Sequence, residues 1–117
     1  MKEELGDLQR LKHVKKCIDD LMQIMDGVDA DTFYRDTEKK YAVERVLEII
    51  GEAINNVSPV TLGKANRVIS WRDIIDFRNL VSHEYFRVDY TMVYKIATEG
   101  VLDLRMTIEN LIQQLEY

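Results

Sequence analysis

Three side chains suited to phosphate chemistry lie within eight consecutive residues of this chain. The segment Arg-Asn-Leu-Val-Ser-His-Glu-Tyr occupies positions 78–85 and holds one of only two histidines in the protein. The guanidinium of Arg78 can clamp a phosphate through paired hydrogen bonds at any physiological pH. The imidazole of His83 can transfer a proton near neutrality, and the phenol of Tyr85 can position a phosphate oxygen or act as a nucleophile. These groups would suffice to cleave a phosphodiester without a metal.

The motif lies in the one locally basic part of an acidic protein. The formal net charge of the 117-residue chain is −5, which argues against indiscriminate nucleic-acid binding. Residues 64–87 nevertheless hold five basic and three acidic side chains, a local charge of +2. The alternative is that these charges are solvated and cluster by chance.

Composition predicts one soluble domain over residues 1–117. Apolar residues make up 46% of the chain and charged residues 32%, which is an ordinary balance for a globular protein. The single cysteine, Cys17, rules out an internal disulfide and fits a reducing cytoplasm. The charged N-terminus does not resemble a signal peptide, and no apolar run approaches the roughly 18 residues of a membrane span.

The elements that must position the motif are predicted to be helices. The chain has only five glycines and one proline, and its apolar residues recur at three- and four-residue steps. The first helix should begin at Asp7 as N-cap and end at Gly27, and the second should run from Asp36 or Thr37 to before Ser58. Segments 28–36 and 58–70 are predicted to be loops, with short turns around Phe33 and within 63–68.

The third helix should begin after Ser70, with Asp73 in its first turn, and the last should run from Asp89 to near the C-terminus. The pattern therefore predicts an all-α fold, an antiparallel bundle of four to five helices. The near-heptad stripes of the first and last helices could also bury a second subunit.

Arg78 and His83 would not share one face of an unbroken helix. They are five residues apart, which is about 140° around a regular helix. The third helix could end near Ser82, or the pair could act across a subunit interface. A purely structural alternative is a histidine at a helix end, with Arg78 paired to Asp73 or Asp76.

No other part of the sequence predicts a reactive site. His13, His83 and Cys17 are too dispersed for a typical metal cluster, although a magnesium site made of carboxylates alone stays open. There is no phosphate loop or dinucleotide motif, so no cofactor is predicted. Cys17 is expected to be a quiet, partly buried thiol and His13 a solvated surface residue.

The motif and its surroundings resemble the HepT-like toxins of the HEPN superfamily. The resemblance rests on Ile-Gly-Glu-Ala at 50–53, the Pro59 loop, and the run from Trp71 through Phe86, whose core is R-x4-H-x-Y. It extends over about residues 8–115 and implies a HEPN-like helical homodimer that acts as a metal-independent endoribonuclease. In this family two motifs meet at the dimer interface to form one composite cleft.

The resemblance also implies roles for individual residues. Arg78 and His83 would be catalytic, and Asn79 would support them by holding a phosphate oxygen or orienting the histidine. Tyr85 would help to bind RNA, and it would be the tyrosine that receives AMP from an MntA-like nucleotidyltransferase antitoxin of a type VII-like toxin–antitoxin module. Arg72 and Arg87 are weaker candidates for RNA binding. Two other functions stay open: a non-catalytic binding module for a nucleotide or a nucleotidyltransferase, and a structural helical dimer.

Overall fold

The structure of the chain, a computed structural model, is helical and contains no strand among the residues it describes. It describes residues 2–67, 69–83 and 87–116, with the backbone alone for residues 2–4, 82 and 83. The all-α prediction is confirmed. In chain order the elements are α1 (Lys2–Met25), α2 (Ala30–Arg35), α3 (Thr37–Asn55), α4 (Pro59–Leu62), α5 (Trp71–His83), α6 (Tyr90–Lys95), the π-helical stretch η2 (Ile96–Gly100) and α7 (Val101–Glu116).

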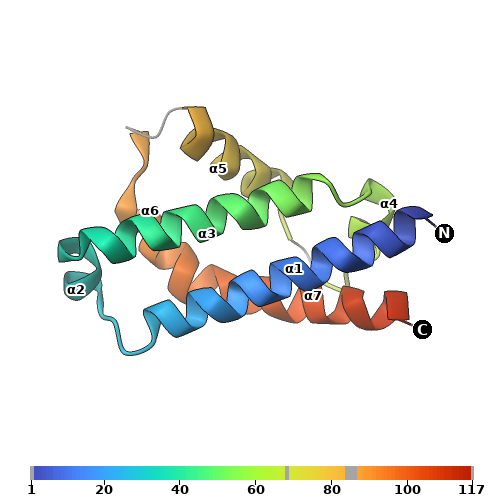
Figure 1. Ribbon diagram of the computed structural model, residues 1–117, viewed down its shortest axis with the longest axis horizontal. Coiled ribbons are helices and arrows are strands. Elements are labelled where there is room, and N and C mark those ends of the chain that lie inside the picture. The colour runs from blue at the N-terminus through green and yellow to red at the C-terminus, as the bar shows by residue number, and fades with distance from the viewer. Residues whose placement is uncertain (1, 68, 84–86, 117) are drawn as a thin grey trace.

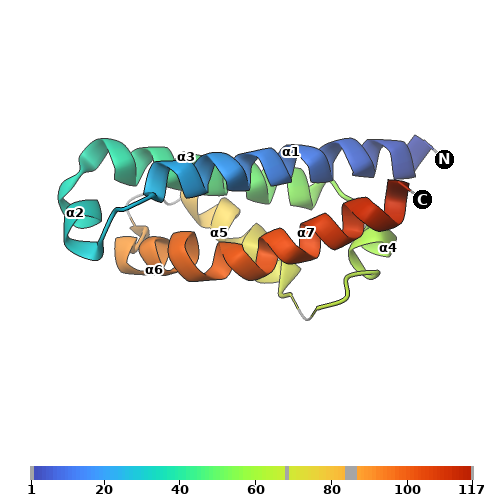
Figure 2. The ribbon, with the colours of Figure 1, turned by 90° about the horizontal axis from the view of Figure 1, so that it is seen from below.

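The three long helices form the body of the bundle. α1 packs against both α3 and α7, and α5 packs against α3 (Figure 1). Figure 2 shows α1 and α3 in one layer and α6 and α7 in the other, with the two labelled ends of the chain at the same end of the molecule. α5 lies on the opposite side of α3 from α1, at the edge of the bundle. The helix that carries the motif is therefore attached chiefly through α3.

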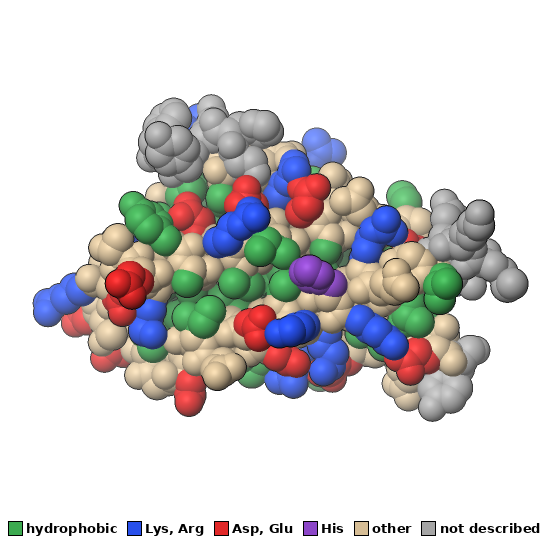
Figure 3. Space-filling view, viewed as in Figure 1, with side chains coloured by type: hydrophobic (Ala, Val, Ile, Leu, Met, Phe, Trp, Pro, Cys, Tyr) green, Lys and Arg blue, Asp and Glu red, His purple; other side chains and the backbone are tan. Residues whose placement is uncertain are grey.

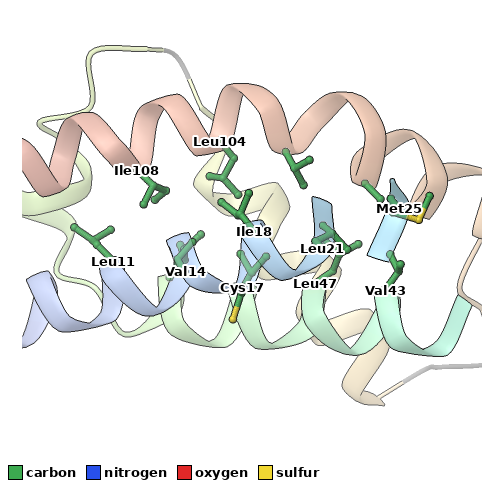
Figure 4. Packing of buried hydrophobic residues seen from close by; sticks show 14 of the residues in the cluster. Leu11, Val14, Cys17, Ile18, Leu21, Met25, Val43, Leu47, Leu104 and Ile108 are labelled. Carbon is green, nitrogen blue, oxygen red and sulfur yellow. The ribbon is translucent and has the colours of Figure 1, made fainter. Parts of the chain in front are cut away.

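The core follows the apolar stripes that the sequence predicts. Each fully buried aliphatic side chain contributes roughly 1.5–3 kcal/mol relative to exposure, so this shared seam holds the long helices together. Burial also raises the pKa of the Cys17 thiol, which keeps it in its unreactive protonated form. Figure 4 shows the middle of the core, with labelled side chains from α1 (Leu11, Val14, Cys17, Ile18, Leu21, Met25), α3 (Val43, Leu47) and α7 (Leu104, Ile108).

The predicted starts of three helices are confirmed by their caps. Asp36 accepts a hydrogen bond from the Lys39 backbone N–H at 3.0 Å and begins α3. The Ser70 hydroxyl accepts from the Asp73 N–H at 3.3 Å, and α5 begins at Trp71. Asp89 caps α6 in the same way, and the helical run continues through η2 and α7.

Two short helices replace the predicted loops. α2 occupies most of segment 28–36, where Asp29 caps it and Phe33 is fully buried. α4 lies at 59–62, one turn earlier than the turn predicted within 63–68, because Ser58 supplies a cap and Pro59 fits the first helical position. The turn predicted around Phe33 is confirmed as α2. Helices of four and six residues are too short to produce an apolar period, so the pattern did not give their full extent.

The prediction that Asp7 caps the first helix is wrong. α1 begins at Lys2, and Asp7 is a buried residue within it. Its carboxylate accepts hydrogen bonds from the Ser58 hydroxyl and the Thr61 hydroxyl, both at 2.6 Å, and from the Ser58 N–H at 3.0 Å. Asp7 therefore joins the start of α1 to α4 instead of ending a helix.

Candidate active site

Arg78 lies where α5 packs closely on α3, against Gly51. A Cβ atom built on Gly51 would lie 2.5 Å from the Cβ of Arg78 and 3.2 Å from the Ile74 carbonyl oxygen. Real Cβ atoms do not come so near to another carbon, so the two helices can pack this closely only because position 51 has no side chain. Glycine thereby sets the place from which the Arg78 side chain extends.

The guanidinium of Arg78 is fixed by two acceptors. One terminal nitrogen forms an ion pair with Glu52 on α3, and the other donates to the Asn79 Oδ1 at 2.7 Å. The side chain of Arg78 is only 25% exposed, and its Nε is buried without a hydrogen-bond partner among the described residues. A buried donor without an acceptor lowers the free energy of unfolding by about 1–3 kcal/mol. Other contacts of the fold must therefore offset this loss to keep Arg78 in place. The alternative pairing of Arg78 with Asp73 or Asp76 is wrong.

A hollow of about 330 Å³ opens beside this guanidinium between α3 and α5. Arg45, Glu48, Ile49 and Glu52 line it on the α3 side, and Arg45 donates to Glu48 at 2.8 Å. Figure 3 shows basic and acidic side chains mixed on this face of the molecule. The hollow is large enough for a phosphate group with its attached sugar oxygens, and Arg78 lies on its wall.

The other members of the motif are only partly described. His83 is the last described residue of α5, and its side chain lies outside the described residues, as do Tyr85 and Phe86. The helix extends one residue beyond the predicted end near Ser82. Positions 78 and 83 are therefore both helical and about 140° apart around α5.

The basic side chains around the motif do not form one patch among the described residues. Arg67 pairs with Asp103 of α7 at 3.1 Å, on a different side from Arg78. Arg72 is 90% exposed near the beginning of α5 and lies 3.8 Å from Asp76. Arg87 is exposed after the undescribed residues. The local charge of +2 is thus dispersed among the described residues.

Sequence reasoning missed the contributions of α3. Glu52 was noticed only as part of the Ile-Gly-Glu-Ala run, although Arg45, Glu48 and Glu52 recur at three- and four-residue steps and so share one face of the helix. A second unforeseen pair is Glu44 and Tyr90, whose hydroxyl donates to the carboxylate at 3.1 Å. Burial raises the pKa of Glu44 and raises that of Tyr90 to about 12.

The remaining sequence candidates lie outside this site. His13 is exposed on α1, as expected, and Cys17 belongs to the core. The described residues contain no group of three or more His, Cys, Asp or Glu side chains that could hold a metal ion. No helix within the described ranges is long and apolar enough to cross a membrane. A second cavity, of about 290 Å³ between α3, α5 and α7, is lined mainly by apolar side chains and does not include Arg78.

Comparison with known proteins shows which family the chain is similar to. The family described as "Ribonuclease HepT-like" matches residues 14–111. "Putative RNase MJ1380" of Methanocaldococcus jannaschii is 30% identical over 85% of this chain and 90% of its own length. "Probable ribonuclease HepT" of Thermococcus cleftensis is 30% identical over 86% of this chain and 91% of its own length. "Putative RNase TTE0752" of Caldanaerobacter subterraneus subsp. tengcongensis is 27% identical over 89% and 92%. No solved structure matches the chain significantly.

Proposed function

The chain belongs to the HepT-like ribonuclease family, and we propose that it is a metal-independent endoribonuclease that acts as the toxin of a type VII-like toxin–antitoxin module. The observation that carries the proposal is the placement of Arg78, which is oriented by two acceptors on the wall of a phosphate-sized hollow. The names of the relatives support RNA as the substrate.

RNA supplies its own nucleophile, so the proposed reaction needs only a charge clamp and a proton carrier. The 2′-oxygen attacks the adjacent phosphorus, the bond from phosphorus to the 5′-oxygen breaks, and a cyclic phosphate and a 5′-hydroxyl result. His83 carries the proton from the 2′-hydroxyl to the leaving 5′-oxygen, an effect worth typically about 10²–10⁴-fold. Arg78 stabilises the charge that builds on the phosphate oxygens, and Asn79 keeps one of its nitrogens oriented.

A homodimer with a composite cleft fits the helical state of α5. Because positions 78 and 83 lie about 140° apart around the same helix, one chain does not direct both toward one point by helix geometry alone. A second subunit would supply the missing partner. The position of α5 at the edge of the bundle leaves it accessible for such an interface.

Tyr85 is proposed as the point of control. An MntA-like nucleotidyltransferase, encoded with the toxin and acting in the same cytoplasm, would transfer AMP from ATP to its hydroxyl and release pyrophosphate. The added AMP would place bulk and negative charge where an RNA phosphate must bind. Coexpression with the nucleotidyltransferase should increase the intact mass by whole AMP units. An unchanged mass, or an increase that persists in Tyr85→Phe, would contradict this assignment.

The catalytic assignment is tested with paired substitutions. Arg78→Ala and His83→Ala should each abolish RNA cleavage by the purified protein and relieve growth inhibition, because each removes one of the two proposed catalytic groups. EDTA should leave wild-type cleavage unchanged. Cleavage is measured on a labelled oligoribonucleotide, and toxicity is measured as inhibition of cell growth.

The matched controls are the exposed residues Arg35→Ala and His13→Ala, which should keep full activity. Full toxicity of His83→Ala, or a strict requirement for a metal, would overturn the mechanism. RNA binding without any cleavage by the wild-type protein would instead support the binding-module alternative.

A further inference from the structure

The acceptor that holds Arg78 from another helix is Glu52. Asn79 follows Arg78 directly in the chain, so it can restrain the guanidinium only relative to α5. Glu52 is on α3, and its ion pair restrains the same group relative to the neighbouring helix. The two contacts act on different terminal nitrogens and together determine the direction of the guanidinium plane.

We propose that Glu52 is a positioning residue, which orients Arg78 toward the scissile phosphate without touching RNA itself. The inference rests on the proposed ribonuclease function and adds a residue to it. Among the described ion pairs, those of Arg45, Arg72 and the lysines of α1 with the next turn of their own helix are ordinary exposed pairs. The Glu52 pair bridges two helices, as Asp19 and Arg105 also do. It holds the more buried guanidinium, however, with 25% exposure for Arg78 against 35% for Arg105.

The packing around Arg78 leaves few other ways to orient it. The Gly51 contact brings the arginine Cβ against the α3 backbone, and the Nε is buried with no described partner. Among the described residues, only the two terminal nitrogens of the guanidinium have hydrogen-bond partners. If Glu52 were removed, Asn79 alone would hold one of them, and the group could rotate away from the hollow.

The arrangement still leaves hydrogens for a ligand. Each terminal nitrogen of arginine carries two hydrogens, and each uses one for its present acceptor. One hydrogen remains on each nitrogen, so Arg78 keeps two charged donors for phosphate oxygens. The hollow of about 330 Å³ that Arg78 and Glu52 both line is the space where this phosphate would bind.

The test compares two substitutions at the same position. Glu52→Ala removes the acceptor, and kcat should fall by about 10- to 100-fold, as when groups that orient a ligating side chain are lost elsewhere. Glu52→Gln keeps an oxygen acceptor without the charge, and kcat should stay within about threefold of wild type. Glu109→Ala on α7 is the matched control, because Glu109 also pairs with an arginine, Arg105, at 3.0 Å. It should retain wild-type kinetics.

Two results would overturn the proposal. If both Glu52 variants bind RNA more tightly and cleave it at least as fast, Glu52 masks Arg78 and does not position it. If both behave like Glu109→Ala, the pair is only a surface contact. Far-UV circular dichroism of each variant ensures that a loss of kcat does not come from unfolding.

A binding measurement separates this proposal from the proposed function. The probe is a 2′-O-methyl oligoribonucleotide, which cannot be cleaved because its 2′-oxygen is blocked. Glu52→Ala should weaken its binding in the wild-type background and have no effect in the Arg78→Ala background, because Glu52 acts only through Arg78. If Glu52→Ala weakens binding of the probe by the same factor in both backgrounds, the positioning role is refuted. A wild-type protein that binds this probe but cleaves no RNA would refute the ribonuclease function and leave the positioning role testable.

Discussion

Arg78 shows how much the chemistry of one side chain depends on residues far away in the sequence. Its charge and fork of donors are intrinsic, but the direction of the fork is determined by Glu52, 26 positions earlier, and its distance from α3 by Gly51. An arginine on an exposed helix face would be free to sample many rotamers, and each phosphate contact would cost that freedom. Here most of that ordering is already present in the folded chain.

Gly51→Ala should separate α5 from α3 and move Arg78. The added methyl would overlap the Arg78 Cβ, and overpacking of this kind costs typically about 1–3 kcal/mol. We expect a lower midpoint in urea unfolding and reduced RNA cleavage. Gly100→Ala is the control, because its new Cβ would meet nothing nearer than 3.8 Å. That variant should be neutral or up to about 1 kcal/mol more stable, since alanine favours a helix over glycine. Equal effects of the two substitutions would contradict the close-contact interpretation.

At the scale of elements, α5 is the least enclosed of the longer helices. It packs on α3, and Val81 is its only buried side chain among those described, whereas α1 and α7 bury several each. Such an edge helix suits a site that must receive a polymer or a second subunit. Because α5 packs mainly on α3, its position depends on α3, which is held in turn by its packing against α1.

The Asp7 network connects the beginning of α1 to α4, just beyond the end of α3. Burial by itself would raise the pKa of Asp7, but hydrogen bonds from Ser58 and Thr61 outweigh it and lower the pKa below its ordinary value of 3.8. A carboxylate with a lowered pKa in the folded state contributes stability that is complete above the unfolded pKa. That stability is lost as the pH falls through the folded pKa.

Asp7→Asn should therefore destabilise the protein at neutral pH, by roughly 1–3 kcal/mol, because the amide cannot accept all three hydrogen bonds. The difference from wild type should begin to narrow below about pH 4. Urea unfolding at a series of pH values measures it. The exposed Asp26→Asn is the control and should show no difference at any pH. A constant cost for Asp7→Asn down to pH 3 would show that the charge is not involved.

At the scale of the whole molecule, an acidic protein is expected to bind RNA at one restricted place. The net charge is −5, and the described basic side chains near the motif point to different sides. Long-range attraction is therefore weak, and affinity must come from the site itself. The proposed catalytic positions 78 and 83 lie about 140° apart around α5, so the proposed mechanism predicts that an oligomer, not the monomer, is the active unit.

Mixing two inactive variants tests this directly. Arg78→Ala and His83→Ala homodimers should each be inactive, because every cleft lacks one of the two groups. After subunit exchange, a heterodimer holds one Arg78 and one His83 in its composite cleft, and part of the cleavage activity should return. Activity is measured on heterodimers isolated through two different affinity tags. Verified heterodimers that stay inactive would contradict a cleft shared between subunits, and a wild-type protein that sediments as a monomer would do the same.

The sequence by itself determined which chemistry is possible and most of the helical frame. Side-chain types are local facts, and apolar periods over fifteen or more residues predict long helices because burial must face one side. The caps at Asp36, Ser70 and Asp89 are likewise local, since each side chain bonds a backbone group two or three residues away. The extent of the two short helices was not predicted because they are too short for an apolar period, and the role of Asp7 was not predicted because it depends on contacts with Ser58 and Thr61 far along the chain.

Only the tertiary structure decided the surroundings of the motif. Nothing in the spacing of residues pairs Arg78 with Glu52. Asp73 and Asp76 are nearer in the sequence, but at five and two residues from Arg78 neither shares its face of the helix. The packing of α5 on Gly51 brings the α3 carboxylate into reach and buries the Nε. The sequence therefore determines that position 78 carries an arginine, and the packing of α5 on α3 determines the direction of its guanidinium.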